Sequence, residues 1–360
     1  MIEAYWRNAR KVVVTGCCGT LGARLVEELV GPEQPFQGEV LGIDNNEDGI
    51  FRMEARWVHE PRARFLLGDI RDRFALRRLF MGADTVLHGA AYKHVYQCEK
   101  APFEAVRTNI YGLESVIEAA SEAGVARVLF TSSDKAVNPT NVMGTSKLMG
   151  ERLMTAANAS GGQTVFASTR FGNILGSRGS VTEVFAEQIS RGGPVTITSR
   201  QMTRFVMTCE QAVRLVLSSV PLARGGEVFI TKMPVLAIED LARVMIEALA
   251  PRYGYRPEDI AITEVGPRPG EKLMEELMTE TETLRTHELR DFFVVLPAFR
   301  PVYQGIDYDY PHTIRRTIQA PYVSRDEPRL DPESIRQLLV QMGLVRRSGQ
   351  AVEAGDPCAS

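Results

Sequence analysis

Short apolar runs alternate with amphipathic segments over the first half of the chain. The runs that favour buried strands, because β-branched and large apolar residues cluster in them, lie at residues 11–15, 39–43, 64–67, 84–89, 125–130 and 164–171. Helical periodicity predicts helices ending near residue 30 and over 103–122 and 145–157. Strands and helices alternating at this spacing predict an α/β fold with a doubly wound parallel sheet.

The pattern loosens beyond residue 175. It predicts a loop and short helix over 176–193, helices over 203–220, 238–249 and 331–342, and strands over 227–230 and 260–265. Residues 296–330 are rich in Pro and Tyr and are predicted to be irregular. We therefore expect a sheet domain of residues 8–176 and 203–232, a smaller C-terminal α/β lobe of residues 177–202 and 233–345, and a disordered polar tail at 346–360.

A glycine-rich turn follows the first strand. Glycines let the backbone approach a diphosphate, and the next helix aims its N–H groups at it. The residues expected to contact a dinucleotide here are Thr15, Gly16, Gly19, Thr20, Leu21 and Gly22. Because a strand precedes this turn and a helix follows it, the motif predicts a Rossmann dinucleotide site.

Asp44 ends the second predicted strand, at the distance from the glycines where an acidic residue accepts hydrogen bonds from a ribose 2′-OH. A carboxylate there would repel a 2′-phosphate, so Asp44 favours NAD(H) over NADP(H). The alternative is an acidic turn residue within the run DNNED.

Further cofactor contacts are expected where the next strands end. Asp69 and Ile70 would bracket the adenine, and the small residues Ala90 and Ala91 would let the nicotinamide ribose lie close. Lys93 follows in the same loop, and Asn109 on the next predicted helix would support the site. A single Asn or His is more often structural, which applies to Asn109 and His94.

The segment FTSSDKAVNPTNVMGTSK, residues 130–147, places hydroxyl, acid and amine groups at the carboxyl end of a predicted strand. Open α/β sheets position their chemistry at such ends. Asp134 and Lys135 alone could be a solvated surface pair. The glycine turn and Asp44 favour a reactive site instead.

Charge and composition narrow the function. A net charge of −3 gives no sign of a nucleic-acid surface, and no apolar run approaches the length of about 20 residues that a membrane span needs. The N-terminus has no apolar signal region, and the five cysteines lack metal-ligand spacing. We expect a cytoplasmic protein without a metal site, in which Cys17 and Cys18 are small apolar residues.

The chain resembles the extended short-chain dehydrogenase/reductase superfamily over most of residues 10–280. It is most similar to the nucleotide-sugar 4,6-dehydratases of bacterial polysaccharide and nonulosonic-acid biosynthesis. The motifs that carry this resemblance are TGCCGTLG, HGAAYKHV, PFEAVRTNIYG, SSDKAVNPTNVMGTSK, RFGNILGSRGSV, MTRFVMT, GEVFITKMP and GPRPGEKLMEEL.

The superfamily places a Ser or Thr, a Tyr, and a Lys four residues after the Tyr around the nicotinamide. Ser133 and Lys147 match this pattern, but Met143 stands at the tyrosine position. A thioether cannot take a proton, so the usual base for the C4 hydroxyl of the sugar is missing. One branch of the dehydratases, which includes large membrane-anchored members, is similar in carrying Met here.

The resemblance implies a three-step reaction with NAD as a catalytic cofactor. Hydride leaves C4 of the sugar, water is lost across C5 and C6, and hydride returns to C6. Asp134 would be the acid for the C6 hydroxyl and Lys135 the base for C5–H, so Asp134 must be protonated and Lys135 neutral when they act. Ser133 would bind O4 and Lys147 the nicotinamide ribose; Asp134, Lys147 or a water remains open as the acceptor of the O4 proton.

The substrate implied is a nucleotide sugar, for which UDP-N-acetylglucosamine is favoured and GDP-N-acetylglucosamine is the alternative. The residues expected to bind it are Lys93, His94, Asn173, Arg178, Arg204, Arg268 and Glu271. Arg268 and Lys272 suit a phosphate, although they could equally form a solvated face. The resemblance also implies a homo-oligomer, a dimer or hexamer, formed through the helices around 103–122 and 145–157.

Two other functions remain open. A nucleotide-sugar 4-epimerase needs the same cofactor but has no use for an acid–base pair that removes water, so Asp134 and Lys135 disfavour it. The second function is a non-catalytic NAD-binding sensor, which Met143 suggests because it replaces the usual base. A sensor has no need to keep acid, base and phosphate-binding residues together, and this disfavours it.

Overall fold

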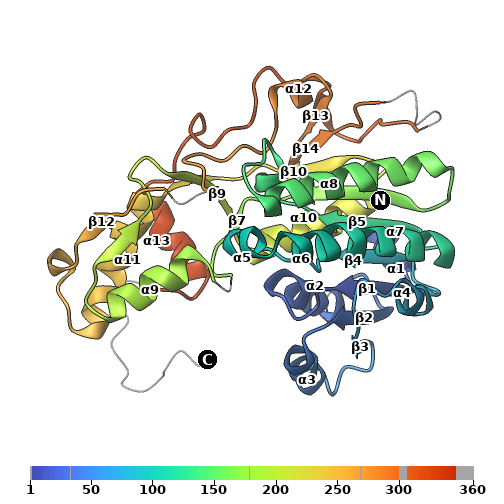
Figure 1. The fold of residues 1–360 in the computed structure, drawn as a ribbon, viewed down its shortest axis with the longest axis horizontal. Helices are drawn as coiled ribbons and strands as arrows, with labels where there is room; N and C mark the ends of the chain where they lie inside the picture. The colour runs from blue at the N-terminus through green and yellow to red at the C-terminus, as the bar shows by residue number, and fades with distance from the viewer. Residues whose placement is uncertain (1, 33, 178, 268–269, 300–305, 346–360) are drawn as a thin grey trace.

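The computed structural model describes residues 2–32, 34–177, 179–267, 270–299 and 306–345. Helices cover both faces of one large sheet, and a smaller group of helices and short strands lies beside it (Figure 1). The tail predicted to be disordered, residues 346–360, lies outside the described residues. None of the helices in the described ranges has the length and apolar character needed to cross a membrane.

The large sheet is parallel over most of its width, as predicted. Its order reverses between β1 and β4, and in open α/β sheets ligands bind beyond the carboxyl ends of the strands at such a reversal. β14, β13 and β15 continue one edge in antiparallel pairing. Across the sheet the strands are β15 (Thr313–Arg315), β13 (Thr286–Leu289), β14 (Phe292–Val295), β10 (Val228–Thr231), β6 (Val165–Arg170), β5 (Arg127–Thr131), β4 (Thr85–His88), β1 (Lys11–Thr15), β2 (Glu39–Asp44) and β3 (Ala63–Leu67).

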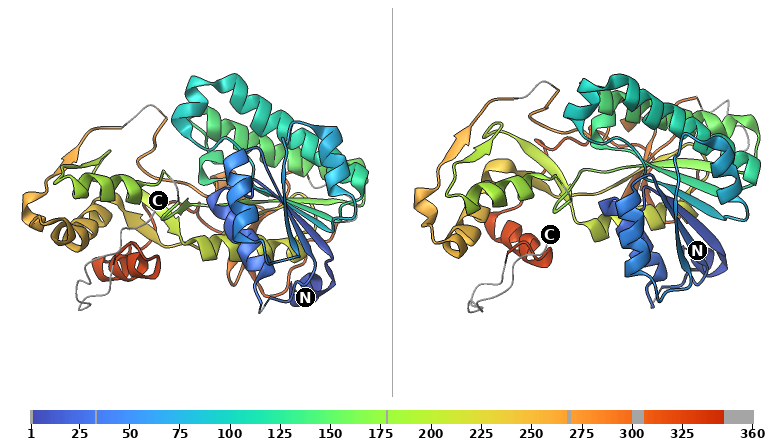
Figure 2. Two further views of the ribbon diagram at one scale, coloured as in Figure 1. Left: turned by 90° about the horizontal axis from the view of Figure 1, so that it is seen from below. Right: turned by 60° about the horizontal axis from the view of Figure 1, so that its bottom comes forward.

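The helices divide between the two faces of this sheet (Figure 2). One face carries α4 (Arg73–Phe80), α5 (Val95–Lys100), α6 (Pro102–Val106), the π-helical turn η1 (Arg107–Tyr111), α7 (Gly112–Ala123) and α8 (Val142–Ala157). The other carries α1 (Ile2–Asn8), α2 (Thr20–Val30), α3 (Glu47–Arg56) and α10 (Cys209–Leu222).

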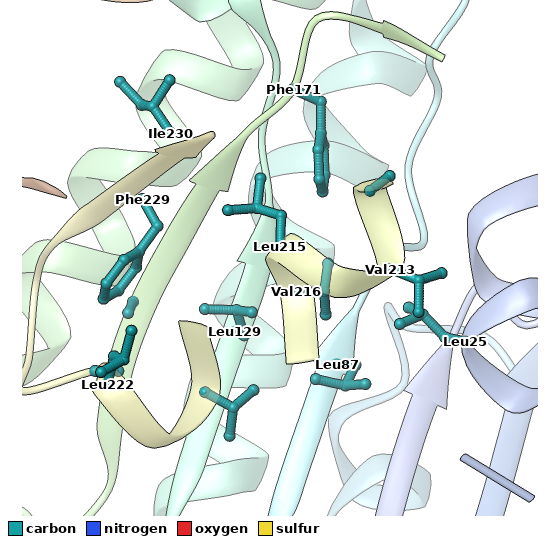
Figure 3. Close-up of a cluster of buried hydrophobic side chains, with 14 of the residues drawn as sticks. Leu25, Leu87, Leu129, Phe171, Val213, Leu215, Val216, Leu222, Phe229 and Ile230 are labelled. Atoms are coloured by element: carbon teal, nitrogen blue, oxygen red, sulfur yellow. The ribbon is translucent and has the colours of Figure 1, made fainter. Parts of the chain in front are cut away.

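Helix α10 forms the centre of one core. Figure 3 shows Val216 of this helix near Leu87 and Leu129 of the central strands and Val213 beside Leu25 of α2, all of them buried. Burying a side chain of this size contributes about 1.5–3 kcal/mol, so α10 fixes the strands whose ends form the site described below.

The start of α10 corrects a prediction. A single helix was expected over 203–220, but residues Thr203–Met207 form β9 and the helix begins at Cys209. The β-branched and aromatic residues of TRFVM suit a strand. Thr208 then caps the helix, its hydroxyl accepting from the backbone of Gln211 while the Gln211 side chain accepts from the backbone N–H of Thr208.

The helix predicted over 103–122 is also interrupted. The turn η1 inserts a π-helical segment that contains Asn109. Such π-helical turns are frequent at functional sites. Large apolar side chains on these helices are exposed, among them Phe103, Tyr111 and Met149. The contact between copies that was expected here stays a prediction.

A smaller lobe has a separate core made by α9, α11 and α13. Its elements are β7 (Asn173–Ile174), α9 (Val181–Ser190), β8 (Val195–Ile197), β9, β11 (Val235–Ala237), α11 (Ile238–Leu249), β12 (Ile262–Glu264) and α13 (Pro332–Gln341). Two strands predicted to belong to the sheet domain, β7 and β9, pair instead in the separate sheet with β11. Part of the segment predicted to belong to this lobe, residues 286–315, extends the large sheet through β13, β14 and β15. Four 3-10 turns (Asp134–Ala136, Asn158–Ser160, Ala250–Tyr253, Pro257–Asp259) and the short α12 (Glu280–Thr283) complete the described elements.

A buried ionic cluster ties α12 to the sheet. Arg170 at the end of β6 donates to both carboxylate oxygens of Glu151 on α8 (2.8 and 2.7 Å) and of Glu282 on α12 (both 2.8 Å). All three side chains are buried, and every carboxylate oxygen has a partner. Removing one member leaves a buried charge uncompensated.

We predict that Glu282→Gln lowers the free energy of unfolding by about 3–5 kcal/mol in urea denaturation. Burial raises the pKa of Glu282, but the Arg170 guanidinium outweighs this effect and lowers that pKa from 4.5 to about 2. The stabilisation is therefore complete above about pH 4.5 and is lost as the pH falls towards 2. Glu280→Gln, at an exposed position of the same helix, is the control; equal unfolding midpoints for the two variants would contradict the prediction.

Candidate active site

The segment that follows β5 continues alongside β6 and the residue after it. Backbone N–H groups of Ser132 and Asp134 donate to the carbonyls of Thr169 (2.7 Å) and Phe171 (2.8 Å). Residues Asp134–Ala136 then form a 3-10 turn whose first amides are capped by the Ser133 side chain. The backbone thus fixes where the Asp134 and Lys135 side chains begin.

Asp134 is buried, with 1% of its surface exposed. Its Oδ1 accepts from the Ser133 hydroxyl at 2.7 Å and from Nζ of Lys135 at 3.1 Å. Its Oδ2 is buried without a hydrogen-bond partner among the described residues. Oδ1 therefore holds the predicted base, while the hydrogen-bonding capacity of the buried Oδ2 is not used by the described residues.

A second carboxylate, Glu275, lies beside Lys135. Its Oε1 is 3.8 Å from Nζ of Lys135 and 3.5 Å from Nε of Arg204, and only 2% of the residue is exposed. The sequence analysis did not select Glu275. Its segment contains the neighbouring pair Glu275-Glu276, and because side chains alternate along an extended chain, only one of the two can face inward.

Lys135 was expected to be neutral when it acts as a base, but the charges around it favour its protonated form. Burial lowers the pKa of Lys135, but the carboxylates of Asp134 and Glu275 outweigh burial and raise it above its usual value. Burial raises the pKa of Glu275, and the nearby charge of Asp134 adds to this effect. In this arrangement Lys135 is an ammonium ion, and it becomes a base only after giving up a proton.

Helix α8 carries Met143 and Lys147 and places Lys147 at the carboxyl end of β5. Met143 is buried against Cys98 and Ala105 and offers no titratable group. Lys147 donates to the Thr131 carbonyl (2.8 Å) and lies 4.6 Å from the centre of the Phe130 ring. Burial lowers the pKa of Lys147 to about 8, so its neutral form is accessible near neutral pH.

Two contacts hold the start of α8. Gly144 packs so tightly on the turn before it that an added Cβ would lie 2.2 Å from the Lys135 carbonyl. Asn109 donates to the Ser146 hydroxyl (2.9 Å), and its Oδ1 accepts from the N–H of Tyr92 (2.8 Å). The structure thus gives Asn109 a supporting position between the loop after β4 and α8.

The glycine turn lies where the sheet order reverses. Gly16 has a φ of +75°, and a Cβ there would come within 2.7 Å of the Ala90 backbone N. Helix α2 begins at Thr20, followed by Leu21 and Gly22, and none of the described side chains caps its first turn. Its leading N–H groups therefore face outward, as a diphosphate requires. Thr15 is buried, and its hydroxyl hydrogen-bonds to Nδ1 of His88 (2.7 Å).

Asp44 ends β2 as predicted. Its two oxygens accept from the backbone N–H groups of Cys18 and Asn46, both at 3.0 Å. The Sγ atoms of Cys17 and Cys18 and a carboxylate oxygen of Asp44 lie within 4.8 Å of one another. Burial raises the pKa of Cys18 to about 11, which disfavours the thiolate that metals bind. Cys17 packs in the core as a small apolar residue.

The remaining residues predicted to contact the cofactor have different surroundings. Asp69 is paired with Arg71 (2.6 Å), and Ile70 is buried. Ala90 and Ala91 follow β4 beside the glycine turn, and Lys93 and His94 are exposed further along that loop. Gly179 of the second lobe lies close to the His94 ring.

A cavity of about 170 Å³ opens in the smaller lobe. Its apolar walls include Leu175, Phe185 and Ile197, and its polar groups include three of the residues predicted to bind substrate, Asn173, Arg204 and Glu271. Oδ1 of Asn173 is buried without a partner among the described residues, and Glu271 accepts from the Thr198 hydroxyl (3.1 Å). Arg178 and Arg268 lie outside the described residues.

Arg204 joins this cavity to the reactive groups. It lines the cavity and also contacts Glu275, which in turn lies beside Lys135. Its guanidinium donates to the Thr203, Leu273 and Lys272 carbonyls, which hold it in place. Through Arg204, the lobe cavity therefore lies next to the group formed by Glu275 and Lys135.

Known proteins resemble the chain over most of its length. An uncharacterized membrane protein of Methanocaldococcus jannaschii is 44% identical over 92% of this chain and 96% of its own length. A UDP-N-acetylglucosamine 4,6-dehydratase (inverting) of Campylobacter jejuni is 36% identical over 84% of this chain and 87% of its own. A UDP-glucose 4-epimerase of Rickettsia conorii is also 36% identical, over 80% of this chain and 83% of its own.

Among solved structures, that of Pen from Bacillus thuringiensis superposes with a TM-score of 0.85 at 37% identity, covering 94% of this chain and 98% of its own. The family model described as "Polysaccharide biosynthesis protein" matches residues 12–297. The chain therefore belongs to this polysaccharide biosynthesis protein family.

Proposed function

We propose that the chain is an NAD-dependent 4,6-dehydratase of a nucleotide-activated sugar, with UDP-N-acetylglucosamine as the favoured substrate. The observation that carries the proposal is the buried contact between Asp134 and Lys135 at the carboxyl end of β5. An acid next to a base is what loss of water from neighbouring carbons requires. The dehydratase relative from Campylobacter supports the same chemistry.

The residues present fit NAD. The glycine turn and the uncapped start of α2 would hold its diphosphate, Asp44 the adenine ribose, and Lys147 the nicotinamide ribose. When bound, NAD supplies hydride acceptance at C4 of the sugar and hydride return at C6.

The chain's own groups handle the protons. Lys135 takes the proton from C5, and Asp134 gives one to the leaving C6 hydroxyl. Ser133 would hold O4, although its hydroxyl now donates to Asp134. Among the acceptors left open for the O4 proton, Lys147 gains support because burial lowers its pKa to about 8.

The lobe cavity supports a nucleotide as the end of the substrate that takes no part in the reaction. It combines apolar walls suited to a flat base with Asn173, Arg204 and Glu271 for polar contacts. In this proposal the sheet domain binds the cofactor and the smaller lobe binds the nucleotide.

Proton NMR of UDP-N-acetylglucosamine incubated with enzyme in D2O tests the function. We expect a 4-keto-6-deoxy sugar with a methyl group at C6 and deuterium at C5, since the base exchanges its proton with solvent. A parallel incubation with GDP-N-acetylglucosamine shows which of the two nucleotide sugars the enzyme converts. Epimerisation at C4 without a methyl signal, or no turnover of either substrate, would refute the dehydratase.

Asp44 should make the chain prefer NAD(H) over NADP(H) by at least about tenfold, or 1.4 kcal/mol, because its carboxylate would face the 2′-phosphate. Calorimetric titration of both cofactors measures this ratio. Asp44→Ser should narrow it, while Asp48→Ser, at an exposed neighbouring acid, should not. Equal affinities in the unmodified protein would disprove the role of Asp44.

Lys135→Ala should abolish deuterium uptake at C5 and lower product formation by about 10²–10⁴-fold, because one positioned proton-transfer group is lost. Oxidation at C4 should largely persist, since Ser133 and Lys147 remain. Asp134→Asn should instead allow C5 exchange while slowing loss of the C6 hydroxyl. If Lys135→Ala exchanges at the unmodified rate, Lys135 is not the base.

A further inference from the structure

Glu275 is a buried carboxylate that fold stability does not account for. Its Oε1 lies 3.8 Å from Nζ of Lys135 and 3.5 Å from Nε of Arg204, both beyond ordinary hydrogen-bond length. Its Oε2 is buried with no partner among the described residues. Burying a carboxylate with so few partners costs free energy, so a role other than packing is indicated.

The Arg170 cluster shows how this fold treats a purely structural buried carboxylate. Both oxygens of Glu151 and of Glu282 accept hydrogen bonds of 2.7 to 2.8 Å from one guanidinium. Glu275 has no such partner, although its backbone is fixed on both sides by Ser324 at 2.9 Å. The chain thus holds the Glu275 main chain firmly and leaves its carboxylate facing Lys135.

We propose that Glu275 is a positioning residue for the acid–base pair, whose carboxylate holds the Lys135 ammonium group beside Asp134 and sets the pH at which Lys135 loses its proton. Its use in catalysis rests on the proposed dehydratase function. The charge coupling between Glu275 and Lys135 does not, because it needs no substrate.

The groups that face Glu275 determine the sign of the effect. They are Asp134 and Lys135 from the turn after β5, Arg204 from β9, and Lys272 from its own segment. Asp134 and Glu275 both favour the charged form of Lys135, whereas Arg204 opposes it. Removing the Glu275 charge therefore leaves the effect of Arg204 less balanced, and Lys135 should release its proton at lower pH.

Competitive acetylation with acetic anhydride measures this directly, because only the neutral amine reacts. Lys135 is accessible to a small reagent, since 26% of its side chain is exposed. Mass spectrometry of the peptide that contains Lys135, over an alkaline pH series, gives its titration midpoint in the full chain. In Glu275→Gln we expect the midpoint to fall by at least about one pH unit relative to the unmodified protein.

Three further variants make the test decisive. Glu275→Met is neutral without a polar group to bury, so it should show the same shift even if the Gln variant does not fold. Glu275→Asp keeps the charge and should restore most of the midpoint. Glu276→Gln is the matched control, because the neighbouring carboxylate contacts Asn138 instead, and its midpoint should not move.

The same variants are then assayed for C5 deuterium exchange against pH with UDP-N-acetylglucosamine. The rising limb of the profile should move to lower pH in the neutral variants, whereas a purely structural defect would lower the rate without moving it. If the unmodified protein exchanges no substrate, the dehydratase proposal fails while the acetylation result still decides the role of Glu275. A Lys135 midpoint unchanged in both neutral variants would overturn the inference.

Discussion

The structure around the site depends on one buried contact, between an acid and a base that are neighbours in the chain. Asp134 and Lys135 meet at 3.1 Å at the end of β5, where a charge without compensation would be costly. The backbone of the turn is bonded to β6, the start of α8 packs against it, and Glu275 and Arg204 close the far side. Each of these elements arrives from a different part of the chain, so the site exists only when the sheet and the smaller lobe are both folded.

Met143 offers no titratable group, and Lys147 lies one turn further along α8. The Met143 side chain packs with Cys98 and Ala105 on one side of α8. Nζ of Lys147 lies over the Phe130 ring and donates a hydrogen bond to the Thr131 carbonyl, and burial lowers the pKa of Lys147 to about 8. Lys147 is therefore a second amine, distinct from Lys135, whose charge can change near neutral pH.

Local pattern was enough to predict the features that depend on nearby residues. Short segments of sequence predict the strands of the parallel sheet, the glycine turn and the place of Asp44 at the end of β2. The structure contains all three features. The helix expected over 203–220 was wrong because TRFVM is compatible with either state until its pairing with β7 and β11 is known. Glu275 could not be told from Glu276, since only the distant residues Ser324 and Lys135 decide which one faces inward. For the same reason the raised pKa of Lys135 was not foreseen.

That raised pKa is compatible with Lys135 acting as a base. A protonated Lys135 beside an ionised Asp134 carries the same number of protons as a neutral Lys135 beside a protonated Asp134. Moving one proton from Nζ to Oδ1, along their existing 3.1 Å contact, converts the first state into the second without any other reactant. In the proposed dehydratase reaction, this transfer would create the base for C5 and the acid for the C6 hydroxyl at once. Its free-energy cost is set by the nearby charges: Arg204, at the edge of the lobe cavity, favours loss of the Lys135 proton, whereas Glu275 stabilises the Lys135 ammonium ion and is also repelled by an ionised Asp134, so it acts on both ends of the transfer.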